Sequence, residues 1–413
     1  MSSLADKDHR YLWHPFTQMK DWMAEEPIII ASGDGAVLRD TEGHEYLDGN
    51  SSIWTNLHGH RHPRITAAIQ SQLDQIAHSS FLGLSNVPAI QLAERLCQLT
   101  HLDRVFYSDD GSTAMEVAIK MAFQYWQHRG QPHRKKFVAF RDAYHGDTLG
   151  AVSVGGIDLF HAPFRPLLFD AVRISRLGEL PSGDDVAAVV IEPLIQGAAG
   201  MKLWPRGLLR ELRAWCDRTG ALLIADEVMT GFGRTGTMFA CEQEGVRPDL
   251  MALAKGLSGG YLPLAATMTT EEVFNAFLGD YSDFRTFFHG HSYTGNPLGC
   301  AAALANLQVF EEERTLEKLP DLARRLYDGL ERCRGLRGVV DVRCLGMIGA
   351  VELGPYPLEA KMGIKVCSEM RRRGVLTRPI GNVIVLMPPY CVTEEQLDQM
   401  TGALAESVQA ACG

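Results

Sequence analysis

Residues 221–236 read ALLIADEVMTGFGRTG and contain the clearest indication of the fold. An apolar run from Ala221 to Ala225 leads directly into two carboxylates, Asp226 and Glu227, and then into a glycine-rich turn. A short, continuously apolar run that stops at turn residues is typical of a strand buried on both faces of a sheet. Because burial of an isolated charge is costly, the two carboxylates indicate a polar site at the end of this strand.

Similar short apolar runs recur between residues 104 and 268, and helical stretches separate them. The runs span residues 105–107, 137–140, 186–191, 250–254 and 264–268. This alternation predicts a doubly wound α/β domain whose mostly parallel sheet has helices on both faces.

Polar and ionisable side chains follow one predicted strand after another. They occur in residues 108–113, 142–147, 192–193, 226–227 and 255–256. The carboxyl ends of parallel strands lie at one edge of a sheet, and ligands bind outside that edge. The sequence therefore predicts a single site built from these segments.

The chain after residue 300 has a different pattern, with an amphipathic helix expected over 316–333 and strands over 339–342, 348–353 and 383–386. This pattern predicts a smaller α+β domain. The hairpin-like stretch 37–46 near the N-terminus is expected to pack with it. We therefore divide the chain into an N-terminal segment (1–58), a large domain (59–300) and a C-terminal small domain (301–413).

The composition argues against several classes of binding partner and of cellular location. A net charge of -10 over 413 residues, without a long Lys/Arg block, argues against nucleic acid or an anionic membrane as the main partner. No apolar run approaches the roughly 18 residues of a membrane span, and the first residues lack the apolar core of a signal peptide. Nine cysteines without a C-x-x-C pair fit reduced thiols. We expect a cytoplasmic protein.

Lys255 directly follows the apolar run 250–254, and this position is expected to bury its amine. Burial lowers the pKa of an ammonium group and yields the neutral amine that attack on a carbonyl carbon requires. A lysine and an aspartate that face one bound heterocycle form the arrangement that pyridoxal phosphate needs, and Asp226 ends a neighbouring run. The alternatives are a lysine that extends to solvent at the sheet edge and an aspartate that caps a helix.

Two other segments fit the same cofactor. Gly111 and Ser112 join a strand to a helix, where backbone N–H groups and a hydroxyl can bind a phosphate. Tyr144 can stack on one face of a planar ring while the branched Val228 presses on the other. An ordinary helix cap and two core side chains would have the same spacing.

Several motifs together resemble the class III (ω-type) pyridoxal-phosphate aminotransferases. They are SDDGSTAMEVAIKMA (108–122), AYHGDT (143–148), IADEVMTGFGRTG (224–236), PDLMALAKGLSGGYLPLAA (248–266) and HGHSYTGNPLGCAAA (289–303). The resemblance implies fold type I with a seven-stranded sheet, and a homodimer with active sites at the subunit interface.

The same resemblance implies roles for single residues. It implies that Lys255 holds the cofactor and catalyses proton transfer, and that Asp226 lies at the pyridine nitrogen. It further implies phosphate binding by Gly111 and Ser112, and ring stacking by Tyr144 and Val228. The partner subunit would complete the site through Gly290, His291 and Ser292.

The stretches YLWHPFTQM (11–19), SSIWTNLHGHRHP (51–63) and TRPIGNVIVLMPPY (377–390) resemble the branch of this family that serves biotin synthesis. This resemblance implies a keto-acid carboxylate on Arg378 and an aliphatic chain beside Ile53 and Trp54. Phe16 falls where a substrate-contacting tyrosine is common, and Asp147 where a donor ammonium group would bind. The departures at Phe16 and Ile53 leave S-adenosylmethionine and lysine open as amino donors.

Two alternatives use the same residues differently. Another ω-aminotransferase of this family would act on a diamine, an ornithine-like acid or a β-amino acid. A metal-dependent hydrolase would use the alternating histidines of residues 58–62 and 289–291 with Asp226 and Glu227. The second alternative gives Lys255 no task, so we expect no metal site.

Overall fold

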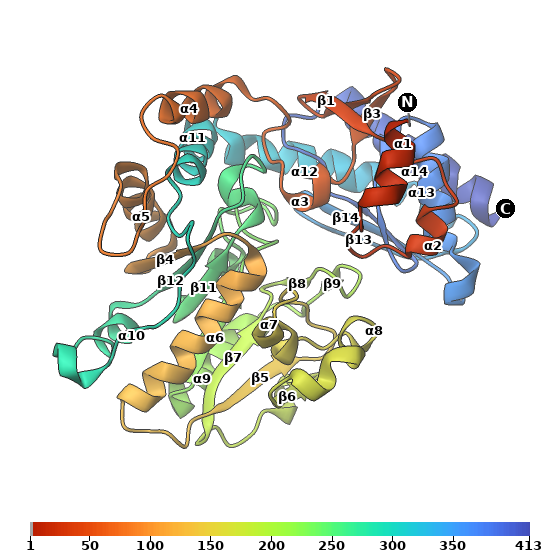
Figure 1. The fold of residues 1–413 in the computed structure, drawn as a ribbon. Coiled ribbons are helices and arrows are strands. Elements are labelled where there is room, and N and C mark those ends of the chain that lie inside the picture. The colour runs from red at the N-terminus through yellow and green to blue at the C-terminus, as the bar shows by residue number, and fades with distance from the viewer. Residues whose placement is uncertain (1–2) are drawn as a thin grey trace.

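The computed structural model describes residues 3–413, and its centre is a seven-stranded sheet (Figure 1). The strand order is β4-β12-β11-β10-β7-β5-β6. Neighbouring strands pair in parallel from β11 to β6, whereas β12 runs antiparallel to both β4 and β11. In chain order the strands are β4 (Arg104–Ser108), β5 (Lys136–Phe140), β6 (Ala171–Ile174), β7 (Val186–Ile191), β10 (Leu222–Asp226), β11 (Leu250–Leu253) and β12 (Ala265–Thr269). The predicted mostly parallel, seven-stranded α/β sheet is confirmed.

Both faces of the central sheet are buried, which explains why its strands are continuously apolar. In β10, Leu222 and Ile224 join one core cluster with helix α6 (Gly111–His128). The alternate residue Leu223 joins a second cluster with helix α9 (Leu208–Thr219). Successive side chains of a strand point to opposite faces, so the two helices cover opposite sides of the sheet.

The N-terminal and C-terminal segments of the chain share a sheet. Strands β1, β2 and β3 form a meander, and β15 pairs in parallel with β3 through Val375 opposite Leu47. Figure 1 shows these N-terminal strands and the C-terminal helices grouped on one side of the molecule. A second antiparallel sheet has the order β13-β14-β17-β16, and β8 pairs with β9. The bounds are β1 (Ile30–Asp34), β2 (Val37–Asp40), β3 (Glu45–Asp48), β8 (Ile195–Gln196), β9 (Lys202–Leu203), β13 (Val339–Leu345), β14 (Ile348–Leu353), β15 (Val375–Leu376), β16 (Pro379–Ile380) and β17 (Val383–Leu386).

Helices join and cover these sheets. The remaining ones are α1 (Leu4–Tyr11), α2 (Met19–Trp22), α3 (Ser51–Trp54), α4 (Pro63–Leu73), α5 (Val87–Thr100), α7 (Leu149–Val154), α8 (Asp158–His161), α10 (Glu271–Asn275), α11 (Pro297–Glu312), α12 (Thr315–Glu331), α13 (Met362–Arg372) and α14 (Glu394–Cys412). Within residues 3–413, no helix combines the length and apolar character needed to cross a membrane.

The segment named α3 is not an ordinary helix. Ser51, Ser52, Ile53 and Trp54 all have positive φ angles, of 43°, 49°, 76° and 69°. A left-handed conformation costs about 1–2 kcal/mol for each residue that carries a Cβ atom. The surrounding structure must therefore hold this turn in place.

Candidate active site

A cavity of about 570 Å³ lies at the carboxyl edge of the central sheet. It is lined by the segments that follow β4, β5, β7, β10 and β11, together with the residues that lead into the antiparallel β12. The predicted site residues that line it are Trp54, Gly111, Ser112, Tyr144, Asp147, Asp226, Val228 and Lys255. The structure therefore brings these residues together in one cavity, as their positions after successive strands predicted.

Lys255 follows β11 after one residue, Ala254, and begins a short 3-10 turn, with a positive φ of 40°. Burial lowers the pKa of its amine, and the charges of Asp226 and Glu192 only partly oppose that effect. The Nζ atom lies 5.1 Å from the centre of the Trp54 ring. The site thus holds a partly buried amine that deprotonates more readily than an exposed lysine.

Asp226 ends β10 and has a histidine partner that the sequence did not reveal. Its Oδ2 atom lies 2.7 Å from Nδ1 of His145, and its Oδ1 atom accepts the backbone N–H of Val228 at 3.1 Å. Burial by itself lowers the pKa of His145, but the hydrogen bond and charge of Asp226 raise that pKa above its usual value. His145 stands next to Tyr144 in the AYHGDT motif, which was the available signal.

The two carboxylates that end the quoted stretch have different surroundings. Asp226 lines the cavity, whereas Glu227 is fully buried away from it and accepts the backbone N–H groups of Ala240 (3.0 Å) and Cys241 (2.8 Å). Burial raises the pKa of Glu227, and these hydrogen bonds oppose the rise. Asp226 therefore belongs to the site, and Glu227 holds the loop that follows it.

Glu192, at the end of β7, is a second acidic group of the cavity. Burial raises its pKa to about 7, and the nearby charges of His145 and Asp226 act in opposite directions on it. Its two oxygens accept the N–H of Tyr144 at 3.3 Å and of Gly197 at 2.9 Å. Glu192 thus ties the loop that carries Tyr144 to the loop after β7.

The start of helix α6 has the features of an anion site. Asp110 caps the helix, and the first two helical residues, Gly111 and Ser112, line the cavity. The first backbone N–H groups of a helix have no partner within it and can bind an anion. A Cβ atom on Gly111 would lie 2.6 Å from Cγ1 of Val228, so only glycine fits there without movement. The Oγ atom of Ser112 accepts the N–H groups of Asp147 and Thr148, each at 2.7 Å.

Tyr144 connects the cavity to the N-terminal segment. Its hydroxyl donates to Oδ2 of Asp147 at 2.7 Å, and its ring lies 6.4 Å from that of Phe16. Arg378 donates to the backbone carbonyl of Phe16 at 3.3 Å. Phe16 and Arg378 do not line the cavity that contains Lys255. Phe16 lies beside the cavity, because its ring neighbours that of Tyr144, which lines it.

Arg378 and Ile53 line a neighbouring hollow of about 280 Å³, together with Asp48 and Ser52. The guanidinium of Arg378 forms no ion pair with any carboxylate of residues 3–413. A planar guanidinium with free donors can bind the carboxylate of a ligand.

Three further predicted site residues, Gly290, His291 and Ser292, also lie outside the cavity that contains Lys255. Gly290 and Ser292 are exposed, and Nε2 of His291 lies 3.8 Å from Oδ1 of Asp109 at the cavity lining. Their predicted role in a partner's site remains a prediction.

Within residues 3–413, the alternating histidines do not form a metal centre. His60 pairs with Asp48, His62 pairs with Glu313, and burial lowers the pKa of His58 to about 3. No group of three potential metal ligands gathers anywhere in residues 3–413. These contacts do not support the metal-hydrolase alternative.

The comparisons with known proteins agree with this geometry. The family model described as Aminotransferase class-III matches residues 19–408. The chain belongs to the class III aminotransferases. It is 49% identical to the adenosylmethionine-8-amino-7-oxononanoate aminotransferase of Geobacter sulfurreducens, over 100% of this chain and 98% of that protein. The family match confirms the predicted enzyme class, a pyridoxal-phosphate-dependent aminotransferase.

Solved structures give the same result for the fold. The adenosylmethionine-8-amino-7-oxononanoate aminotransferase of Methanocaldococcus jannaschii superposes with a TM-score of 0.96 at 43% identity, over 99% of both chains. An amine transaminase from an uncultivated Pseudomonas species, in its pyridoxal-phosphate-bound form, has a TM-score of 0.91 at 34% identity, over 98% of this chain and 99% of that one. The predicted fold type I is confirmed.

Proposed function

We propose that this class III aminotransferase converts 8-amino-7-oxononanoate to 7,8-diaminononanoate in biotin biosynthesis, with S-adenosylmethionine as amino donor. The full-length similarity to relatives with that activity in their names supports the substrate. One structural observation carries the chemistry: the amine of Lys255 and the carboxylate of Asp226, from neighbouring strands β11 and β10, line the same cavity.

The residues present fit pyridoxal phosphate. Lys255 supplies the amine that holds the cofactor aldehyde, and the Asp226–His145 pair supplies an acidic partner for the ring nitrogen. Gly111 and Ser112 would supply phosphate donors at the start of α6, while Tyr144 and Val228 would contact the ring. When bound, the cofactor supplies an electron-poor ring that stabilises negative charge on the carbon beside the transferred amino group.

The chain's own groups then orient and move protons. Lys255, once its amine is free and neutral, would take a proton from the donor carbon and deliver it to the cofactor carbon within the first half of the reaction, and would move a proton in the opposite direction, to the keto-acid carbon, in the second half. Arg378 holds the carboxylate of the keto acid, and Ile53 and Trp54 line the path of its aliphatic chain. Phe16 closes the approach beside Tyr144. Asp147 attracts the ammonium group of the donor.

The proposed enzyme is a cytoplasmic homodimer with shared active sites. Gly290, His291 and Ser292 lie outside their own chain's cavity, and this supports a role for them in the site of a partner. Their contribution is testable by mixing two inactive variants, Lys255→Ala and His291→Ala. A shared site predicts partial recovery of activity in the mixed dimer, because one of its two sites receives both wild-type residues.

The decisive experiment is incubation of the purified enzyme with 8-amino-7-oxononanoate and either S-adenosylmethionine or lysine. Formation of 7,8-diaminononanoate with the first donor supports the proposal, and formation only with lysine corrects the donor. Transfer from a diamine, an ornithine-like acid or a β-amino acid, with no transfer to 8-amino-7-oxononanoate, would overturn the substrate. The Lys255→Ala variant is the control for enzyme-dependent turnover.

A further inference from the structure

The left-handed turn of residues 51–54 lies between the two hollows of the site. Trp54 lines the cavity that contains Lys255, while the preceding residue, Ile53, lines the hollow that contains Arg378. Neighbouring side chains of one turn thus form the walls of both hollows. A shift of the turn would change both ends of the substrate site at once.

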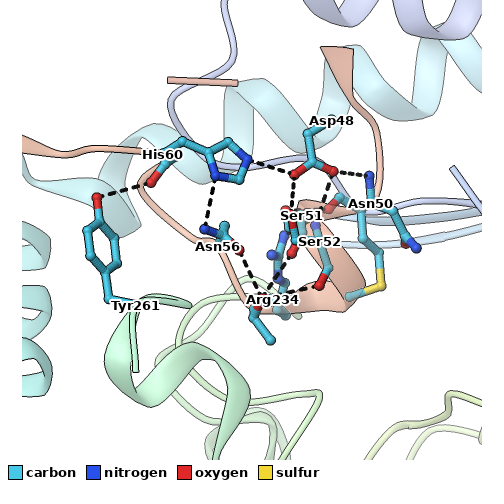
Figure 2. Close-up of polar contacts among 11 residues, drawn as sticks. Asp48, Asn50, Ser51, Ser52, Asn56, His60, Arg234 and Tyr261 are labelled. Atoms are coloured by element: carbon cyan, nitrogen blue, oxygen red, sulfur yellow. Dashed lines mark hydrogen bonds and ion pairs between the residues drawn. The ribbon is translucent and has the colours of Figure 1, made fainter. Parts of the chain in front are cut away.

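The carboxylate of Asp48, at the end of β3, holds the start of this turn (Figure 2). Its Oδ1 atom accepts the backbone N–H groups of Asn50 at 3.2 Å and Ser52 at 3.1 Å. Its Oδ2 atom accepts the hydroxyl of Ser52 and Nε2 of His60, both at 3.0 Å. Asp48 is only 2% exposed, and four donors converge on it. Because strained backbone persists only where its surroundings fix it, this carboxylate is a specific restraint on the turn.

His60 has its own fixed orientation. Its Nδ1 atom lies 3.4 Å from the amide nitrogen of Asn56, which can only donate, so Nε2 carries the proton that is donated to Asp48. Its backbone exchanges two hydrogen bonds with Gly35, at 2.7 and 3.0 Å. A Cβ atom on Gly33 would lie 2.9 Å from the imidazole Cγ, so the ring packs directly on that glycine. The N-terminal sheet therefore sets the direction in which His60 donates.

The first and last residues of the turn are held as well. The indole N–H of Trp54 donates to Oδ1 of Asn50 at 2.8 Å, and Ser51 donates to the carbonyl of Met387 at 2.6 Å. The indole thereby reaches its position 5.1 Å from the amine of Lys255.

We propose that Asp48 and His60 are positioning residues, which hold the left-handed turn and thereby set the indole of Trp54 against Lys255. Neither residue lines the cavity that contains Lys255, and His60 also lies outside the hollow of Arg378, which Asp48 does line. The His60 variants therefore report the effect of the turn alone. This inference rests on the proposed function only for its kinetic consequence. Its structural consequence, a fixed Trp54 indole, is independent of the substrate.

A matched set of variants tests the inference. Asp48→Asn replaces an acceptor with an amide N–H that faces the Nε2–H of His60. His60→Leu removes the donor, whereas His60→Gln restores an N–H at nearly the same place. Asp40→Asn is the control, because Asp40 is also a buried carboxylate with a histidine partner, His44, but does not contact the turn.

The first measurement is near-ultraviolet circular dichroism of the cofactor-free protein. The Trp54 contribution is the difference between each variant and the same variant with Trp54→Phe. We expect that contribution to be lost in Asp48→Asn and His60→Leu and to be retained in His60→Gln and Asp40→Asn. Retention in Asp48→Asn and His60→Leu would overturn the proposal. If Asp48→Asn does not fold, the His60 pair alone decides.

The second measurement is kcat/KM for 8-amino-7-oxononanoate in the cofactor-loaded enzyme. Small displacements of a positioning group can cost about a hundredfold in rate, so we expect losses of that order in Asp48→Asn and His60→Leu. His60→Gln and Asp40→Asn are expected to stay within about threefold of wild type. Equal losses in His60→Gln and His60→Leu would contradict the donor role. An inactive wild type would overturn the proposed substrate alone, since the dichroism test uses no substrate.

Discussion

Nδ1 of His145 lies 2.7 Å from Oδ2 of Asp226, and both side chains are buried beside the proposed ring-nitrogen site. The histidine comes from the loop after β5 and the aspartate from the end of β10, so the pair links two non-adjacent strands. Nε2 of His145 is also buried and finds no hydrogen-bond partner within residues 3–413. Within residues 3–413, the hydrogen bond of the His145 imidazole therefore goes to the Asp226 carboxylate.

This pair makes the stability of the cofactor-free protein depend on pH. The pKa of His145 is raised in the folded state above its ordinary value of 6.5. A raised pKa stabilises the folded state fully below pH 6.5, and that stabilisation is lost as pH rises through the folded-state pKa. We expect His145→Gln to lower the free energy of unfolding by about 3 kcal/mol at pH 6, and by less at higher pH. Urea unfolding across this range checks the sign, and a difference that grows with pH would contradict it.

The lowered pKa of Lys255 gives a prediction for the free amine. An amine is neutral above its pKa, so a lowered pKa makes Lys255 reactive at a lower pH than exposed lysines. A small acylating reagent should therefore modify Lys255 of the cofactor-free protein first as pH rises, with mass spectrometry locating the product. Protection by added pyridoxal phosphate is the control. Preferential modification of exposed lysines at every pH would contradict the prediction.

The same residue should be indispensable for turnover. Lys255→Ala removes both the amine that holds the cofactor and the base that moves the proton, so we expect no detectable amino transfer. Circular dichroism should show an intact fold, because the alanine leaves space at the cavity wall. Normal turnover in this variant would end the proposed mechanism.

Much of the site was predictable because each part follows a recognisable strand. The apolar runs that end at Asp226 and before Lys255 are buried on both faces, and parallel strands bring their carboxyl ends together. The direction of β12 was not predictable, because a continuously apolar strand has the same pattern in either orientation. Strand β6 was missed because it is a short edge strand that contains Arg173 and is only partly buried.

Other features depend on contacts between distant segments. His145 and Asp226 are 81 residues apart, and nothing in the spacing of either residue shows which histidine approaches the carboxylate. The left-handed turn at residues 51–54 contains no glycine, so its sequence carries no local signal for positive φ angles. The hydrogen bonds of Asp48 and His60 fix it, and these become visible only in the folded chain.

Arg378 should act on the keto acid and not on general stability. It is exposed, and its one side-chain hydrogen bond in residues 3–413 goes to the carbonyl of Phe16. We expect Arg378→Ala to raise KM for 8-amino-7-oxononanoate by about ten- to a hundredfold, because loss of a charged hydrogen bond costs about 1.5–3 kcal/mol. Arg372→Ala is the matched control, since that exposed arginine pairs with Glu369 on the surface of α13. An unchanged KM in Arg378→Ala would place the carboxylate elsewhere.

The contact between Gly111 and Val228 gives a test of the phosphate end of the cavity. A methyl group at Gly111 would lie 2.6 Å from Cγ1 of Val228, and a β-branched valine cannot easily rotate away. We expect Gly111→Ala to lower the free energy of unfolding by about 1–3 kcal/mol, the usual cost of overpacking. Val228→Ala, added to Gly111→Ala, removes the clashing group and should restore most of that loss in urea unfolding of the cofactor-free protein. Additive losses in the double variant would mean that the two side chains do not meet. Because Val228 also flanks the proposed ring, the double variant should regain stability while its affinity for pyridoxal phosphate stays reduced, which separates the packing of the cavity wall from its contact with the cofactor.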